Sequence, residues 1–190
     1  MPYDFDAAVG YTAPNYATTN SYLDYQINSV TDVQLTNIMS FRKVNVDGPN
    51  TLTLNGFSKP IEVPDASVTA PIVTALLSVE IKVGDADFTD VELEFNADTN
   101  EYTLADAPSE KFHLRVKTKL NPAANTTGEG LYVGDPENNI LSTQGESQGF
   151  REQTLFQDTP DIRCPFSMSI SADKLDFPTL LGNGNVMVPY

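Results

Sequence analysis

The stretch Lys111-Phe112-His113-Leu114-Arg115-Val116-Lys117-Thr118-Lys119-Leu120 decides the fold class of this 190-residue chain. Apolar side chains stand at Phe112, Leu114, Val116 and Leu120, and cationic or imidazole side chains alternate with them. Successive side chains of a β-strand point to opposite faces of its sheet. The alternation therefore predicts a strand with one buried face and one solvated face.

Similar alternation extends this prediction to most of the chain. Further strands are expected at residues 22–27, 33–42, 51–54 and 91–95, and a hairpin turn at 96–100 should lead from the last of these into a strand at 101–104. Asn55-Gly56, a favourable turn dipeptide, follows the strand at 51–54. Helical periodicity is nearly absent, and 13 prolines and 11 glycines separate the short strands. We therefore predict a single all-β domain over residues 1–190, built as a sandwich of antiparallel sheets.

The composition excludes several classes of partner. The formal net charge of −15 argues against binding to nucleic acid or to an anionic membrane, both of which require clustered Lys and Arg. Self-repulsion of this charge favours a soluble monomer at micromolar concentration. Cys164 is the single cysteine, so no internal disulfide is expected. Residues 1–6 lack the features of a signal peptide, and the longest apolar-leaning run, 70–79, is too short to span a bilayer. A cytoplasmic location is the expectation.

Six short blocks follow one another between residues 121 and 185. They are Asn121-Pro122-Ala123-Ala124-Asn125-Thr126, Glu129-Gly130-Leu131-Tyr132, Thr143-Gln144-Gly145-Glu146-Ser147-Gln148-Gly149-Phe150-Arg151, Pro160-Asp161, Ala172-Asp173-Lys174, and Leu180-Leu181-Gly182-Asn183-Gly184-Asn185. The series resembles the end of the N-terminal β domain of M1-family zinc aminopeptidases of the bacterial aminopeptidase N type. There it runs P-A-A-N-T, E-G-L-Y, T-Q-C-E-A-E-G-F-R, D-R-P-D, A-D-K and L-L-S-N-G-N. Looser matches lie at 11–16 and 52–56, and the resemblance implies a saddle-shaped domain of stacked antiparallel sheets.

The catalytic chemistry of that family needs residues that this chain lacks. The family binds zinc through His-Glu-x-x-His and a further Glu, whereas His113 is the single histidine here. The family's Gly-x-Met-Glu-Asn segment is also absent. We therefore expect no catalysis and no cofactor in this chain, because the zinc belongs to the catalytic domain of the family. His113 is interpreted as an exposed surface residue without an orienting partner, and Cys164 as a residue at the start of a strand.

Two other patterns have ordinary structural interpretations. The acidic stretch at 85–90 suggests a calcium loop but lacks the glycine and the distal glutamate of an EF-hand, so a solvated hairpin connection is favoured. Asn125-Thr126-Thr127 fits a glycosylation acceptor, a pattern that often arises by chance.

Gln144 and Glu146 are the candidate binding residues. The resemblance implies that they line the substrate-entry pocket and that Glu146 helps to hold the free α-ammonium of a peptide. Side chains two residues apart on a strand project to the same side, so an amide and a carboxylate can converge on one amine. Their neighbours Gly145, Ser147 and Gln148 differ from the family, as do Thr159 and Gly182. The alternative is that Glu146 is an ordinary exposed loop acid.

Three functions remain open at this point. In the first, the chain is the non-catalytic N-terminal domain of an M1-type enzyme, either a fragment or a stand-alone homologue, and it caps the active site. In the second, it is a free-standing, non-enzymatic interaction or regulatory module. The third, an unrelated β-sandwich that binds carbohydrate, is disfavoured because the chain has no Trp. The expected partners are a catalytic domain or, weakly, peptide N-termini. An exposed ion pair contributes only about 0–1 kcal/mol, so the isolated chain should bind peptides poorly.

Overall fold

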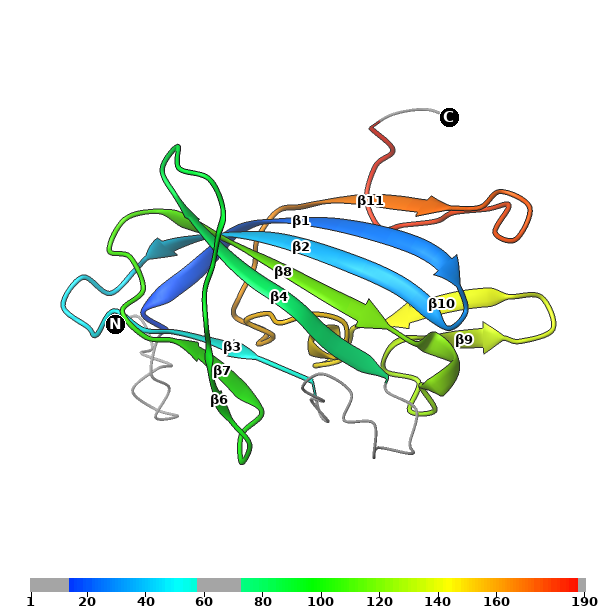
Figure 1. Cartoon of the computed structure of the whole chain (residues 1–190), viewed down its shortest axis with the longest axis horizontal. Helices are drawn as coiled ribbons and strands as arrows, with labels where there is room; N and C mark the ends of the chain where they lie inside the picture. The colour runs from blue at the N-terminus through cyan, green and yellow to red at the C-terminus, as the bar shows by residue number, and fades with distance from the viewer. Residues whose placement is uncertain (1–13, 58–72, 188–190) are drawn as a thin grey trace, which may run out of the picture.

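A curved six-stranded sheet runs along the molecule (Figure 1). The computed structural model describes residues 14–57 and 73–187. In spatial order the sheet contains β11 (Phe166–Ala172), β1 (Tyr16–Ser29), β2 (Asp32–Lys43), β8 (Phe112–Leu120), β4 (Thr74–Val83) and β5 (Thr89–Asp90). Neighbouring strands are antiparallel except for β11, which is parallel to β1.

The alternation in β8 gives the sheet its buried and solvated faces. Phe112, Leu114 and Val116 are fully buried, while His113 and Arg115 between them are half-buried and Lys119 is exposed. The neighbouring strand β2 repeats the pattern, and in register Phe41 lies opposite Phe112 and Met39 opposite Leu114. The side chains of these two strands thus form one continuous apolar surface.

Two smaller sheets lie on the same side as this apolar surface. A three-stranded sheet has the order β3 (Leu52–Asn55), β7 (Glu101–Leu104) and β6 (Glu94–Asn96). A two-stranded hairpin consists of β9 (Gly130–Asp135) and β10 (Ile140–Gln144). The two short 3-10 helices are η1 (Pro122–Ala124) and η2 (Phe150–Glu152). One apolar cluster joins β2, β4 and β8 to β3 and β7, and a second joins β1, β2 and β11 to the hairpin.

The connection from β10 to β11 passes through the interior. Residues 150–158, called here the buried segment, are buried or half-buried although six of them are polar or charged: Arg151, Glu152, Gln153, Thr154, Gln157 and Asp158. Side chains of the large sheet supply hydrogen bonds to this segment. Thr118 Oγ1 in β8 donates to the Gln153 carbonyl at 2.7 Å, and Thr74 Oγ1 in β4 donates to the Glu152 carbonyl at 2.7 Å.

The all-β class with stacked antiparallel sheets is confirmed, with 48% of residues in strands and 4% in helices. Strands cover 22–27, 33–42 and 101–104 as predicted, the strand expected at 51–54 is found one residue later as β3, and β6 and β7 form the predicted hairpin around 96–100. The single-domain boundary stays a prediction. Residues 11–13 of the looser match at 11–16, residues 70–72 of the apolar-leaning run and residues 1–6 lie outside the described residues.

Two local predictions were wrong. The strand expected at 91–95 is interrupted, because residues 91–93 lie between β5 and β6 and belong to neither strand, although the Val91 N–H still donates to the Val79 carbonyl of β4 at 3.0 Å. Asn55-Gly56 is not a hairpin turn, since neither residue has a positive φ and β3 pairs with β7. The Gly56 N–H instead donates to the Asn100 carbonyl at 2.8 Å, and a Cβ at Gly56 would meet the Tyr102 ring at 2.4 Å. The glycine is thus required for close packing.

Candidate functional site

Gln144 and Glu146 lie at the end of the β9–β10 hairpin. Gln144 is the last residue of β10 and pairs with Gly130, and Glu146 follows it in the connection to η2. Both residues are exposed. The Gln144 side-chain amide donates to the Glu146 carbonyl at 3.0 Å, which leaves its oxygen available as an acceptor. Within residues 14–57 and 73–187 no side chain or backbone N–H donates to the Glu146 carboxylate.

A tight turn holds this pair in place. Residues 144–148, called here the exposed turn, are closed by the Gly149 N–H, which donates to the Gly145 carbonyl at 2.9 Å. The Glu146–Ser147 peptide bond is cis. A Cβ at Gly149 would stand 2.5 Å from the Gln144 carbonyl oxygen, so only glycine fits where the chain turns back against β10.

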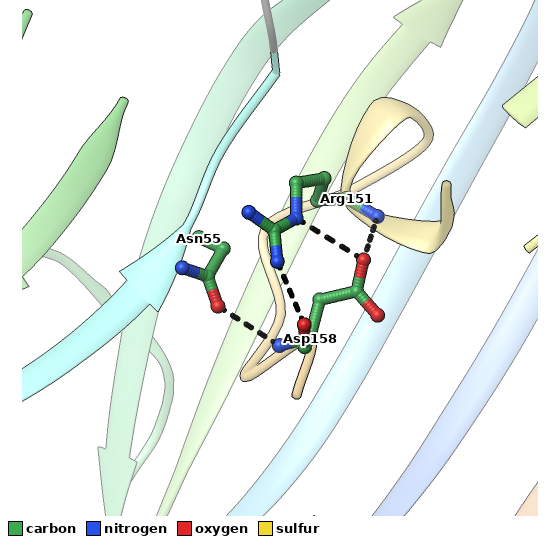
Figure 2. Close-up of polar contacts among 3 residues, drawn as sticks. All are labelled: Asn55, Arg151 and Asp158. Atoms are coloured by element: carbon green, nitrogen blue, oxygen red, sulfur yellow. Dashed lines mark hydrogen bonds and ion pairs between the residues drawn. The ribbon is translucent and has the colours of Figure 1, made fainter. Parts of the chain in front are cut away.

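Arg151 and Asp158 fasten the chain directly after this turn (Figure 2). The Asp158 carboxylate accepts from the Arg151 backbone N–H at 3.0 Å and from Arg151 Nε at 3.2 Å, and the guanidinium also donates to the Asp158 carbonyl at 2.7 Å. The two side chains are 20% and 12% exposed, so this charge-assisted pair is largely withdrawn from water. It closes the loop from 151 to 158.

Asn55 joins this loop to the three-stranded sheet. Its side-chain oxygen accepts from the Asp158 N–H at 3.0 Å, as Figure 2 shows. The Asn55 and Phe156 backbones exchange two hydrogen bonds, at 2.8 and 3.2 Å. The Phe150 ring packs edge-on against Phe156 with centroids 5.1 Å apart. The chain that follows the exposed turn is therefore joined to β3 by three hydrogen bonds.

Arg151 lies in one of the family blocks, but the sequence indicated no role for it, and Asp158 and Asn55 were not predicted as site residues. The signal was present in part, because Arg151 and Asp158 belong to two of the matched blocks, T-Q-C-E-A-E-G-F-R and D-R-P-D. Nothing in the sequence indicates that the two blocks fold against each other.

A shallow hollow of about 270 Å³ opens beside the exposed turn. Its lining includes Ser147 and Gln148 of the exposed turn together with Asn100, Glu129 and Arg151. Gln144 and Glu146 do not line this hollow. The candidate pair therefore faces solvent, and a second wall is needed to enclose any ligand that it binds.

His113 differs from its sequence interpretation. The side chain is half-buried, and its Nδ1 lies 2.8 Å from Ser40 Oγ, so it does have an orienting partner. Burial, together with the nearby Lys111 and Lys82, lowers the pKa of His113 below its ordinary value. Among the described residues, no carboxylate bonds to His113 as the acid of a catalytic triad would.

The other residues considered from the sequence have structural roles or ordinary environments. Cys164 precedes β11, and burial raises the pKa of its thiol, which makes it a poor nucleophile. The acidic stretch at 85–90 follows β4 and includes β5, which pairs with β4, and this confirms the hairpin interpretation. The Asn125 side-chain amide donates to the carbonyls of Glu129 and Leu131, so the glycosylation pattern serves as a loop brace. Over the described ranges, no three His, Cys, Asp or Glu residues gather as a metal site.

No family model matches the chain. It is 32% identical to Escherichia coli aminopeptidase N over 176 residues and 30% identical to the Haemophilus influenzae aminopeptidase N over 175 residues. Both matches cover 92% of this chain and 17% of the relative. Aminopeptidase A of Legionella pneumophila, solved with aspartic acid, superposes with a TM-score of 0.70 at 22% identity, over 92% of this chain and 18% of that one. The chain is a homologue of the N-terminal β domain of M1-family aminopeptidases.

More distant structures share the fold of this M1-type domain. Leukotriene A4 hydrolase from Saccharomyces cerevisiae superposes with a TM-score of 0.58 at 12% identity, over 84% of this chain and 24% of that one. An M1 zinc metallopeptidase from Deinococcus radiodurans superposes with a TM-score of 0.56 at 10% identity, over 82% of this chain and 32% of that one. The M1-type domain spans about a sixth of the length of its curated bacterial relatives. Its described part contains no helix of the length and apolarity that a membrane span requires.

Proposed function

We propose that the chain acts as the non-catalytic N-terminal domain of an M1-type metallo-aminopeptidase, where it caps the active site and contributes to recognition of the peptide N-terminus. The observation that carries this proposal is the exposed turn, which presents the Gln144 side-chain oxygen and the Glu146 carboxylate, a group without a hydrogen-bond partner among the described residues, beside the hydrogen-bonded Arg151, Asp158 and Asn55. Homology to the N-terminal region of aminopeptidase N supports the assignment to such an enzyme.

The chemistry of the pair suits an α-ammonium group. A carboxylate and an amide oxygen both accept hydrogen bonds from an ammonium, and the carboxylate supplies the opposite charge. In water such a contact contributes only about 0–1 kcal/mol, whereas even millimolar affinity requires about 4 kcal/mol. The pair therefore works only when a second surface excludes water, and the catalytic domain is the surface that the proposal assigns to this task.

Zinc does not fit the residues of this chain. A catalytic zinc site takes three protein ligands, and the donor set here has one histidine and no cluster of three candidate ligands in the described ranges. No step of the reaction is therefore assigned to this domain. Its role is to bind and to orient the substrate amine.

A chimera tests the proposal. The corresponding region of Escherichia coli aminopeptidase N is replaced by this chain, and hydrolysis of alanyl and leucyl reporter substrates is measured. We expect an active chimera in which Glu146→Gln raises KM at least about tenfold with a small change in kcat, because ground-state binding of the amine is lost. Glu137→Gln, the same change at an exposed position of the same hairpin, should leave KM unchanged.

Two results would contradict the proposal. One is a folded chimera that has no activity, which would favour a free-standing interaction module. The other is an active chimera in which Glu146→Gln and Glu137→Gln behave alike. The second result would retain the capping role and remove substrate recognition by Glu146.

A further inference from the structure

The solvated face of the large sheet gathers positive charge although the chain has a net charge of −15. Five of the 11 Lys and Arg residues lie on this face in or beside β4 and β8: Lys82, Lys111, Arg115, Lys117 and Lys119. His113 lies among them in β8. This face is turned away from the two apolar clusters, which join the large sheet to the smaller sheets, so the charges are separate from the candidate site at the exposed turn.

Three of these cations already have partners within the protein. The Arg115 guanidinium bonds to the Glu80 carboxylate, with Arg115 Nε donating to Glu80 Oε2 at 2.6 Å. Lys117 Nζ lies 3.5 Å from the same carboxylate, and Lys119 Nζ lies 3.2 Å from Asp32 Oδ1. The fold therefore compensates these three positive charges.

Lys82, Lys111 and His113 lack such compensation. Among the described residues, no carboxylate forms an ion pair with either lysine. Lys82 Nζ lies 6.0 Å from the centroid of the Phe88 ring. Ser40, a buried residue of β2, places its Oγ 2.8 Å from His113 Nδ1 and so orients the ring. The other ring nitrogen, Nε2, is left for a ligand.

The fold keeps these three groups together although they repel one another as cations. Ser40, His113 and Lys82 form one row across β2, β8 and β4, so the Cβ atoms of His113 and Lys82 are about 5 Å apart. Lys111 precedes His113 by two residues on the same face, a distance of about 7 Å along the strand. Burial and the charges of Lys111 and Lys82 lower the pKa of His113. A bound anion would relieve this repulsion.

We propose that Lys82, Lys111 and His113 form a binding site for an oligophosphate group, of the kind that a small molecule with a diphosphate or triphosphate carries. The site offers two ammonium groups and an imidazole at neighbouring positions, and ammonium groups bind phosphate as point charges. An oligophosphate carries several charges in a small volume and can contact all three groups at once. A carboxylate is held best by a guanidinium fork, and the fork on this strand, Arg115, is occupied by Glu80.

The surrounding charges limit the size of the ligand and its affinity. Three uncompensated groups are too few for nucleic acid or a membrane, which need an extended basic surface. The many acids of the chain repel anions, and Asp85 and Asp87 lie exposed in the loop that follows β4. At about 0.15 M salt the Debye length is about 8 Å, so distant acids are screened while direct contacts persist. We expect tripolyphosphate to bind with a Kd of about 1 mM under these conditions.

Titration of the full chain and of matched variants with tripolyphosphate, followed by amide chemical shifts in NMR, tests the position of the site. Lys82→Gln and Lys111→Gln each remove one ammonium group from it. Lys119→Gln makes the same charge change on the same face, at a residue that already pairs with Asp32. We expect the Kd to rise at least about fivefold for the first two variants and less than about twofold for the third.

Citrate tests the chemical class of the ligand. It is a compact anion with several charges, but its charges are carboxylates. We expect citrate to bind at least about fivefold more weakly than tripolyphosphate, because two ammonium groups and an imidazole do not reproduce the fork that a carboxylate prefers.

The single histidine of the chain provides an independent measurement, because its imidazole proton signals report the pKa of His113 without ambiguity. A bound anion favours the imidazolium form, so saturating tripolyphosphate should raise the pKa of His113 by at least about half a pH unit. Sodium chloride at the same ionic strength should not. The other charged groups on the elements beside His113 are the same in both samples: Arg42 on β2, Glu80 and Lys82 on β4, Asp85 and Asp87 after β4, and Lys111 and Arg115.

Four results would overturn the proposal. Tripolyphosphate that fails to saturate the chain below about 10 mM would show that no site exists. Equal weakening by Lys119→Gln and by the two site variants would show that the general charge of the face attracts the anion. An unchanged pKa of His113 at saturation would place the anion elsewhere, and equal binding of citrate would remove the assignment to phosphate.

Discussion

The exposed turn and the buried segment are consecutive in the chain and have opposite surroundings. Residues 144–148 are exposed, and their polar groups bond mainly to one another or to solvent. Residues 150–158 are equally polar, yet they are enclosed by β1, β3, β4 and β8 and bonded to side chains of these strands. Polarity alone therefore does not distinguish a binding residue from a structural one. The distinguishing observation is whether the protein already supplies the partner.

The largest expected effect lies at Gln157 in the buried segment. Its side-chain oxygen accepts from the Thr18 N–H at 3.0 Å and from Thr18 Oγ1 at 2.9 Å, and its amide donates to the Tyr16 carbonyl at 2.9 Å. Gln157→Leu leaves these buried groups without partners, so we expect a loss of about 3 kcal/mol in the free energy of unfolding, measured by urea denaturation. Gln148→Leu, the same change in the exposed turn, should alter stability by less than about 0.5 kcal/mol. Similar losses of unfolding free energy in both variants would contradict the distinction between the buried segment and the exposed turn.

The next effect concerns the Arg151–Asp158 pair. Arg151→Met leaves the largely buried Asp158 carboxylate without its charged partner, and we expect a loss of about 2 kcal/mol in the free energy of unfolding. The loss is smaller than for a fully buried pair because some water reaches both groups. A double-mutant cycle with Asp158→Asn should give a coupling energy of at least about 1 kcal/mol. Additive losses in the cycle would show that the two residues act separately and that the exposed turn lacks the support described above.

The pH dependence of stability above pH of about 10 tests the bond between Tyr25 and the buried segment. Tyr25 donates its hydroxyl to Gln153 Oε1 at 3.0 Å, and burial raises the pKa of Tyr25 well above its ordinary value. Above pH of about 10 the unfolded chain releases this proton and the folded chain keeps it, so stability falls as the pH rises, by up to about 1.4 kcal/mol per pH unit. Tyr25→Phe should be less stable near neutral pH and should decline less steeply above pH 10. Parallel curves for the two proteins would show that Tyr25 ionises normally.

The sequence predicted the strands well because their signal is local. The alternation in β8 is a property of ten consecutive residues, and its burial follows the prediction. The parallel pairing of β11 with β1 could not be predicted, because it joins residues about 145 positions apart and depends on the path of the connection. The buried segment shows neither the two-residue period of a strand nor the period of a helix. Its backbone is irregular, and residues of distant strands supply the hydrogen-bond partners of its polar groups.

The candidate site likewise contains residues that a local motif identifies and residues that come together only in the fold. Gln144 and Glu146 were selected from their positions in a family block, and the structure shows them exposed at the end of β10. The support beneath them, Arg151, Asp158 and Asn55, comes from three separate parts of the chain that meet only in the fold. The motif thus selected two exposed side chains, while the residues that hold them in place could be recognised only in the folded structure.

The smallest expected effect on stability lies at Glu146. Its carboxylate is exposed and receives no hydrogen bond within the described ranges, so Glu146→Gln should change the free energy of unfolding by less than about 0.5 kcal/mol. The same substitution is expected to raise KM in the chimeric aminopeptidase, where a second surface excludes water. This combination of unchanged folding and weakened substrate binding is characteristic of a residue whose partner is the ligand. If Glu146→Gln destabilises the isolated chain as strongly as Arg151→Met, the carboxylate has a partner within the fold, and the distinction between the two segments fails at its most important residue.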